Sequence, residues 1–146
     1  MIMTPRRRAT GALLFIAGLT SCGDDRSWAP VSAAMGTAAE LGRCLRAYER
    51  TVGQYPETLS EIQTERRAGE CHVNPRLLAA NGVRYGGFDW TYFVLPGRKA
   101  FVLSVKSESG AERDCFIRVD QTFVVRRTCE TWWGKSMDTI DLAKSP

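Results

Sequence analysis

The longest regular alternation of apolar and polar positions in this chain runs from residue 31 to residue 52. Apolar side chains recur there at spacings of three and four, the period of one helix face, and charged side chains such as Glu40 and Arg43 fall between them. The segment therefore predicts an amphipathic helix of about 20 residues, and Gly53 follows it as a C-terminal cap. The apolar positions are Val31, Ala34, Ala38, Leu41, Leu45, Tyr48 and Val52.

Two short helices are predicted after this one. Thr58 and Glu61 have the spacing of a capping box, which marks the start of a helix. Asn74 followed by Pro75 is typical of a cap residue with proline at the first helical position, so a helical turn is expected through residues 77–78. The Asn-Gly dipeptide at 81–82 predicts a turn.

Four segments in the second half of the chain have the composition of β-strands. Residues 88–95, 100–106, 114–119 and 123–128 are rich in aromatic and β-branched side chains, and turn-forming residues separate them. Connections this short join only antiparallel neighbours. The sequence therefore predicts an α+β fold, in which a long N-terminal helix packs on an antiparallel meander of about four strands.

The helix is expected to cover one face of this sheet, because no other apolar surface in the chain is long enough to do so. Leu41, Leu45 and Tyr48 would then be buried against inward-facing strand residues. The expected strand partners are Phe93, Leu103 and Val124.

The start of the chain carries a different pattern. Three arginines, residues 6–8, precede an apolar run from Gly11 to Leu19, and the run ends in Leu19-Thr20-Ser21-Cys22. The apolar run is about half the length needed to span a bilayer, so it is typical of a signal peptide. Leu, two small residues and Cys at its end resemble the lipobox of bacterial lipoproteins.

This resemblance implies that residues 1–21 are a leader that is removed, and that Cys22 becomes the N-terminus and carries acyl chains such as palmitate on sulfur and nitrogen. Gly23, not Asp, follows the cysteine. In the lipoprotein family this favours the outer membrane, with the protein facing the periplasm or the exterior. The expected layout is a tether at residues 22–30, a folded domain at 31–133 and a partly ordered tail at 134–146.

The remaining four cysteines, an even number in an exported chain, predict two disulfides, and three pairings are possible. Cys115 and Cys129 flank a predicted hairpin and would lie on neighbouring strands. Cys44 lies on the long helix, and Cys71 lies in the segment after it. We therefore favour the pairs 44–71 and 115–129.

The charge of the chain changes when the leader is set aside. The whole sequence has 20 basic and 16 acidic residues, a net charge of +4. The leader contains three arginines and no acidic residue, so the rest has 17 basic and 16 acidic side chains, a net charge of +1. These charges are interleaved and form no basic cluster, which argues against a nucleic-acid partner.

The segment Leu45–Leu59 contains Gly53-Gln54-Tyr55-Pro56 directly after the predicted helix. It is similar to a signature in the head domains of type IV pilins and type II secretion pseudopilins, which also order a long helix, a Tyr-Pro loop and an antiparallel sheet. The resemblance implies a pilin-head-like fold. It does not imply filament assembly, because a lipobox stands where pilins have a prepilin peptidase site and an apolar half-helix.

Few residues in the sequence are candidates for catalysis, ligand binding or metal binding. His72 lies beside Cys71, so a small hydrolase or a thiol-redox protein is one alternative. Trp132 and Trp133, with Trp90, could form a platform for a partner or a glycan, and a carbohydrate-binding module is a further alternative. Three scattered aspartates, Asp89, Asp114 and Asp120, have no metal-binding spacing, and no cofactor or metal is expected.

We therefore expect a lipid-anchored protein of the bacterial cell envelope that is not an enzyme. Its head would act as a structural or protein-binding module. Its expected partners are the membrane, through the lipid on Cys22, and a protein of the envelope.

Overall fold

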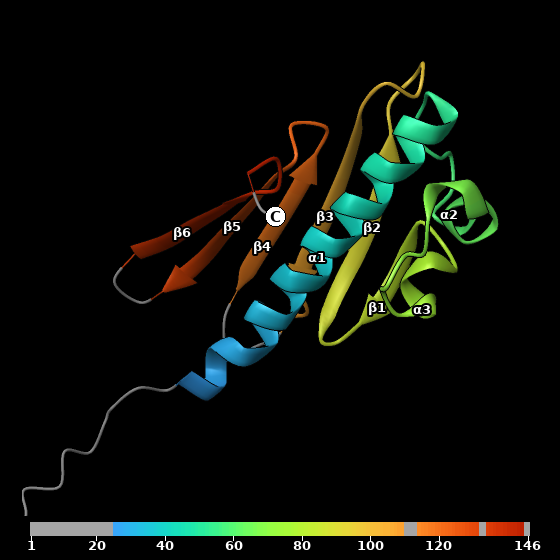
Figure 1. The fold of residues 1–146 in the computed structure, drawn as a ribbon. Helices are drawn as coiled ribbons and strands as arrows, with labels where there is room; N and C mark the ends of the chain where they lie inside the picture. The colour runs from blue at the N-terminus through green and yellow to red at the C-terminus, as the bar shows by residue number, and fades with distance from the viewer. Residues whose placement is uncertain (1–24, 110–113, 132–133, 145–146) are drawn as a thin grey trace, which may run out of the picture.

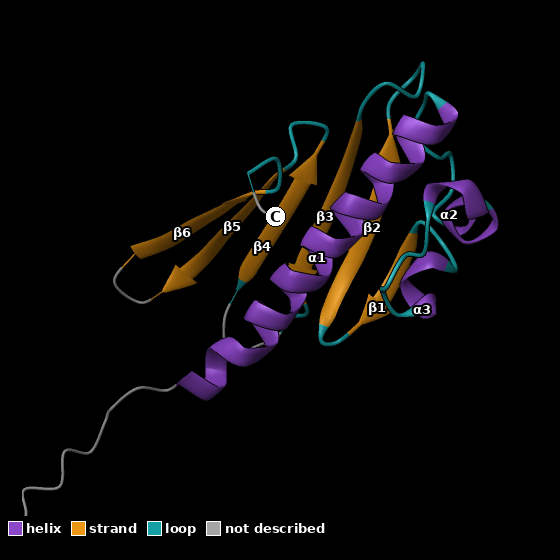
Figure 2. Ribbon diagram, viewed as in Figure 1, coloured by secondary structure: helices purple, strands orange, loops and turns teal. Residues whose placement is uncertain are grey.

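The computed structural model describes residues 25–109, 114–131 and 134–144. In this part of the chain one long helix and three short helical segments pack on one face of a six-stranded antiparallel sheet (Figures 1 and 2). The molecule thus has two layers, with the apolar core between the helices and the sheet.

Helix α1 (Asp25–Val52) is 28 residues long and begins well before the expected start at Val31. The predicted tether at residues 22–30 is therefore wrong from Asp25 onward. Pro30 lies inside the helix. A proline this close to a helix start removes a single backbone hydrogen bond, and the packed turns that follow maintain the helix.

The C-terminal end of α1 is as predicted. Gly53 has a positive φ of 87°, a conformation that glycine adopts without a steric penalty, and its N–H donates to the carbonyl of Glu49 at 2.7 Å. The expected apolar positions of the helix are buried from Val31 to Tyr48, and Val52 is half-buried.

The sheet is larger than predicted. Its strands follow one another in space in the same order as in the sequence, and every neighbouring pair is antiparallel. The predicted fold class, a helix on about four strands, is therefore wrong. A six-stranded sheet is the main body of the fold, so the predicted pilin-head-like arrangement of a helix on about four strands is incorrect. The strands are β1 (Gly82–Tyr85), β2 (Phe88–Val94), β3 (Phe101–Ser107), β4 (Cys115–Asp120), β5 (Val124–Thr131) and β6 (Gly134–Asp141).

Strand β1 is not among the four predicted strands, the first of which begins at residue 88. Gly86 and Gly87 precede that residue. They form the two-residue turn of a hairpin, in which Tyr85 of β1 pairs directly with Phe88 of β2. Both glycines have positive φ values, 62° and 82°, as a tight hairpin turn of this kind requires.

Strand β6 lies where a partly ordered tail was expected. Residues 134–146 are mostly polar and show no apolar alternation, so the sequence gives little strand signal. The strand forms because each of its residues pairs with one on β5, from Thr131 opposite Gly134 to Val124 opposite Asp141. Leu142, just after β6, is buried under α1.

The face that each strand turns toward α1 was predicted only in part. Leu103 is fully buried, as expected. Phe93, however, is 60% exposed, while its neighbour Tyr92 is buried. Val124 is only half-buried, while Val125 is fully buried. Because adjacent strand residues point to opposite faces, these two expectations were each wrong by one residue.

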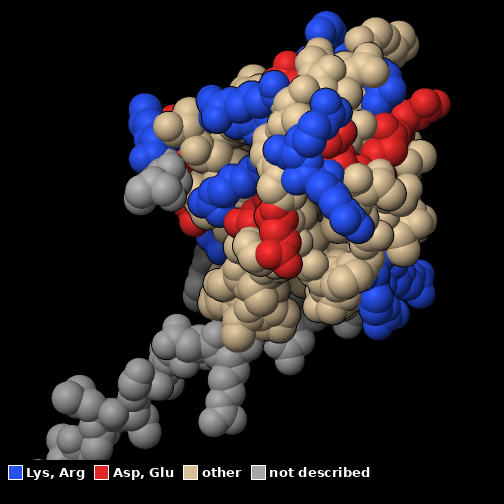
Figure 3. Space-filling model, turned by 45° about the vertical axis from the view of Figure 1, so that its right-hand side comes forward, with Lys and Arg blue, Asp and Glu red and all other residues tan. Residues whose placement is uncertain are grey.

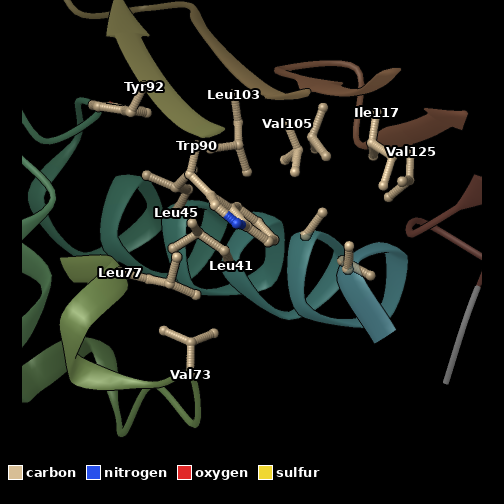
Figure 4. Packing of buried hydrophobic residues seen from close by; sticks show 14 of the residues in the cluster. Leu41, Leu45, Val73, Leu77, Trp90, Tyr92, Leu103, Val105, Ile117 and Val125 are labelled. Atoms are coloured by element: carbon tan, nitrogen blue, oxygen red, sulfur yellow. The ribbon is translucent and has the colours of Figure 1, made fainter. Parts of the chain in front are cut away.

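The core forms where α1 crosses the middle of the sheet. Leu41 and Leu45 of α1 lie close to Trp90 of β2, with Leu103 and Val105 of β3 above them (Figure 4). Leu77, from the short helix α3 (Pro75–Leu78), closes the same core from the side (Figure 4). Asn74 caps α3 by accepting the N–H of Arg76 at 3.0 Å, as predicted.

Two disulfides are present, with the pairing that we favoured. Cys44 of α1 is bonded to Cys71, which follows the 3-10 helix η1 (Arg66–Ala68). Cys115 of β4 is bonded to Cys129 of β5, its direct partner in the strand register. The first bridge ties the helical segment to α1, and the second lies inside the sheet.

Candidate functional site

The Tyr-Pro loop is fixed to the sheet. The ring of Tyr55 is buried and packs edge-on against Phe101 of β3, with ring centroids 4.7 Å apart. The hydroxyl of Tyr92 donates to the carbonyl of Pro56 at 2.7 Å. Burial raises the pKa of Tyr92 above its usual value, so this hydroxyl keeps its proton. The residues that resemble the pilin signature thus have a structural role here.

A carboxylate on the short helix α2 (Ser60–Thr64) holds the same loop. Glu61 accepts hydrogen bonds from the hydroxyl of Tyr48 at 2.8 Å and from Arg98 at 3.1 Å. It also accepts the backbone N–H groups of Glu57 and Thr58 at 2.8 and 2.9 Å. Burial alone would raise the pKa of Glu61, but these hydrogen bonds and the charge of Arg98 lower it. The carboxylate is therefore ionised and fully bonded, which indicates a structural role and not a catalytic one.

The structure does not form a Cys71–His72 dyad. The sulfur of Cys71 is bonded to Cys44 and is not a free thiol. His72 is exposed and lies at the edge of a shallow cavity that is also lined by Gly36, Thr37 and Tyr85. Neither residue has the nucleophile-and-base geometry that the hydrolase or redox alternative needs.

The tryptophan platform does not include Trp90. Its side chain is 3% exposed, and its ring N–H donates to the carbonyl of Tyr85 at 3.0 Å. Trp90 is thus part of the core. Trp132 and Trp133 lie outside the described residues.

The three scattered aspartates have partners within the protein. Asp89 pairs with Arg84 at 3.0 Å, and Asp114 accepts the hydroxyl of Ser107 at 3.3 Å. Within the described ranges, no three Cys, His, Asp or Glu side chains lie close enough together to hold a metal ion.

The face of the sheet opposite α1 is the surface that the sequence did not reveal. No described helix covers it. Phe116 of β4 and Met137 of β6 are 41% and 73% exposed there, and they lie in one row across the sheet because both are aligned with Thr128 of β5. In β4, Cys115, Ile117 and Val119 are buried. This alternation is the signal that could have placed Phe116 on the outer face.

Two arginines lie next to this apolar row. Arg118 of β4 and Arg126 of β5 are directly opposite each other, and both are near Asp120, at 3.6 and 3.5 Å. Burial would raise the pKa of Asp120, but hydrogen bonds from Thr122 and the two nearby guanidinium groups lower it. Each arginine side chain remains 47% exposed, so it can still donate to a partner. We call Phe116, Arg118, Arg126 and Met137 the outer patch.

No family model, no curated protein and no solved structure matches the chain.

A cleft of about 350 Å³ lies on the helical side, beside the Cys44–Cys71 disulfide. Ile62, Val73 and Leu78 supply its apolar lining. On its rim, Glu65 forms two hydrogen bonds with the side chain of Arg67, which lower the pKa of Glu65 to about 2. This rim charge is already neutralised by its neighbour, so it offers little to a charged ligand.

The first turns of α1 are attached to the far strands of the sheet. The guanidinium of Arg127, on the inner face of β5, lies over the ring of Trp28 at 5.0 Å, and Arg127 also pairs with Asp138 of β6 at 3.7 Å. This contact fixes where the chain enters the domain. None of the described helices is both long and apolar enough to cross a bilayer.

Proposed function

We propose that this protein is a lipid-anchored component of the bacterial cell envelope, whose domain binds a protein partner and is not an enzyme. The lipobox Leu19-Thr20-Ser21-Cys22, after an apolar run that follows three arginines, supports the anchor. The two disulfides support an oxidising compartment. Gly23 after the cysteine favours the outer membrane, with the domain in the periplasm or outside the cell.

The outer patch is the single observation that carries the binding role. It combines a large aromatic side chain, a flexible methionine and two half-exposed arginines, and aromatic, methionine and arginine residues are enriched in protein interfaces. It lies on the side of the sheet away from α1, so a partner could reach it without disturbing the core.

The enzyme and glycan alternatives have less support. The hydrolase or redox alternative needs a free thiol at Cys71, which is in a disulfide. The glycan alternative included Trp90 in a binding platform, but Trp90 is buried in the core and cannot contact a glycan. The likeness of residues 45–59 to the pilin and pseudopilin signature stays a prediction that no comparison tests, and the proposal does not depend on it.

The anchor is tested by replacing Cys22. In cells fed a palmitate analogue, we expect the wild-type protein to be labelled and to remain in the membrane fraction. Cys22→Ala should lose the label and be released, or accumulate as an uncleaved precursor. Ser21→Ala is the matched control, because it keeps two small residues before the cysteine. A Cys22→Ala protein that is still labelled would refute the anchor.

The binding role is tested by site-specific crosslinking in intact cells. A photoreactive amino acid at position 116 or 137 should crosslink to the same protein from the envelope. The same group at Arg43, an exposed position on α1, is the matched control and should not. If positions 116 and 137 give no common product, or if Arg43 gives the same one, the outer patch is not the binding surface.

A further inference from the structure

The exposed side of α1 has two different halves. From Trp28 to Ala39 the helix has no charged residue, and Glu40 is the first charged side chain that follows. The exposed side of the second half carries charges, including Arg43 and Arg50. Figure 3 shows an uncharged area low on the molecule, with basic and acidic side chains above it and basic side chains to its right. The exposed residues of the first half are Ala29, Pro30, Ser32, Ala33 and Gly36.

This uncharged surface continues onto the turn of the β1–β2 hairpin, beside the exposed ion pair of Arg84 and Asp89. A shallow groove of about 230 Å³ separates the two elements, with Pro30, Ala33 and Thr37 on the helix side. On the other side the groove is lined by Tyr85, Gly86, Phe88 and Trp90. None of these side chains is charged. Tyr85 is half-buried, and tyrosine is a side chain that favours the boundary between lipid and water.

The position of the anchor places this surface next to the membrane. Cys22 precedes the start of α1 at Asp25 by three residues, and three residues of extended chain span at most about 10 Å. The start of α1 and the β1–β2 turn lie toward the same end of the molecule, and the β2–β3 connection lies at the other end (Figure 1). A lipid on Cys22 would therefore hold this end of the domain close to the bilayer, with Asp25 and Arg26 between the anchor and the uncharged stretch that begins at Trp28.

We propose that the uncharged stretch of α1 from Trp28 to Ala39, together with the β1–β2 turn, rests on the lipid bilayer to which the protein is anchored. This inference depends on the lipid anchor of the proposed function. The covalent lipid makes the contact intramolecular, so a modest apolar surface can remain in contact with lipid although it would not bind a membrane alone. Helix α1 then leaves the membrane obliquely, and its charged half remains in water.

The proposed orientation also concerns the partner site. The outer patch lies on the face of the sheet opposite α1, as the strand register and the burial of Cys115, Ile117 and Val119 show. It therefore stays open to water while α1 contacts lipid. Because the stretch from Trp28 to Ala39 is uncharged, and Asp25 and Arg26 before it carry opposite charges, the contact should not need anionic lipids and should not weaken with salt.

The experiment uses the mature lipidated protein in vesicles of phosphatidylcholine. An environment-sensitive fluorophore is attached to a cysteine introduced as Ala33→Cys or Gly36→Cys, and Arg50→Cys on the exposed side of the same helix is the matched control. A Cβ at Gly36 meets nothing within 4 Å, so this variant keeps the fold. We expect the fluorophores at 33 and 36 to have a blue-shifted emission, and spin-labelled lipid to quench that emission several-fold more than the emission at 50. The result should be the same without added salt and at about 0.5 M salt, where the Debye length is only a few ångströms.

Flotation of the same samples separates the two proposals. If the labelled proteins do not float with the vesicles and carry no lipid, the anchor itself is wrong. If they float, but the fluorophores at 33 and 50 are quenched equally, the anchor stands and the proposed orientation is overturned. A blue shift at 33 that rises with protein concentration in detergent and is not quenched by spin-labelled lipid would instead show an interface between two copies, which also overturns it.

Discussion

Gly42 of α1 and Leu142, just after β6, are in direct contact. A Cβ added to Gly42 would lie 3.0 Å from Cδ1 of Leu142 and 3.2 Å from Cγ1 of Val119. Helix α1 therefore approaches the sheet so closely at this point that only a glycine fits without a shift. Leu142 is thus held against the second half of α1, which a disordered tail would not be.

This close approach predicts opposite effects for the same substitution at two glycines of α1. Gly42→Leu should destabilise the protein by about 1–3 kcal/mol, because the added side chain overfills the contact. Gly36→Leu should stabilise it by about 0.5–1 kcal/mol, because leucine favours the helix and the site is open. Urea melts of both variants test this, and a loss of stability at both positions would contradict the close approach.

The buried face of α1 predicts a large loss of stability for a substitution on that face and a small change for a substitution on the exposed side. Leu45→Ala should cost about 2–5 kcal/mol through lost burial and a cavity. Arg43→Ala, on the exposed side, should change stability by less than about 0.5 kcal/mol. Arg46 is less suitable as the control, because its guanidinium lies over the ring of Phe123 at 4.6 Å. Similar urea midpoints for the two variants would mean that this face does not pack on the sheet.

The hydrogen bonds of Glu61 predict that the free energy of unfolding depends on pH. The pKa of Glu61 is lower in the folded protein than its usual value of 4.5, so the ionised group stabilises the fold above that value. The stabilisation is lost as the pH falls through the folded pKa. The difference in unfolding free energy between the wild type and Glu61→Gln should therefore be full at pH 7 and shrink below about pH 4.5. A difference that does not change between pH 7 and pH 3 would contradict this reading.

The two disulfides should differ in their resistance to reduction. Cys115 and Cys129 have no exposed surface, whereas Cys71 is half-buried. Limited dithiothreitol, followed by alkylation and peptide mapping, should therefore label Cys44 and Cys71 first. Loss of either bridge should cost about 3–4 kcal/mol in the chain-entropy model, since the bridges close loops of 27 and 14 residues. Equal labelling of all four cysteines at each time would contradict the difference.

The sequence predicted those elements whose own residues show a regular spacing of apolar side chains or of cysteines. The spacing of Leu41, Leu45 and Tyr48 places them on one helix face, and all three are buried. The pairing of Cys115 with Cys129 follows from their places on two strands joined by a short turn. Both predictions rest on local geometry, in which residues close in sequence determine which groups can meet.

The missed elements depend on contacts that the local pattern does not contain. Strand β6 is polar and mostly exposed, and its backbone is paired because β5 lies beside it. Phe93 and Val124 each have an apolar neighbour, Tyr92 and Val125, so either residue of each pair could face inward. The outer patch was missed for the same reason, because its arginines and its aromatic residue become one surface only when β4, β5 and β6 are aligned.

Because the strands follow one another along the chain, the order in which the protein is made has a consequence for its folding. Helix α1 is synthesised first, but much of the sheet surface that it covers belongs to β4 and β5, in the last third of the chain. The sheet can grow hairpin by hairpin through contacts between near neighbours, which favours rapid folding. The apolar side of α1 must stay uncovered until these late strands emerge. A nascent chain that stalls before β5 would therefore expose its first helix and be the form most open to aggregation and proteolysis.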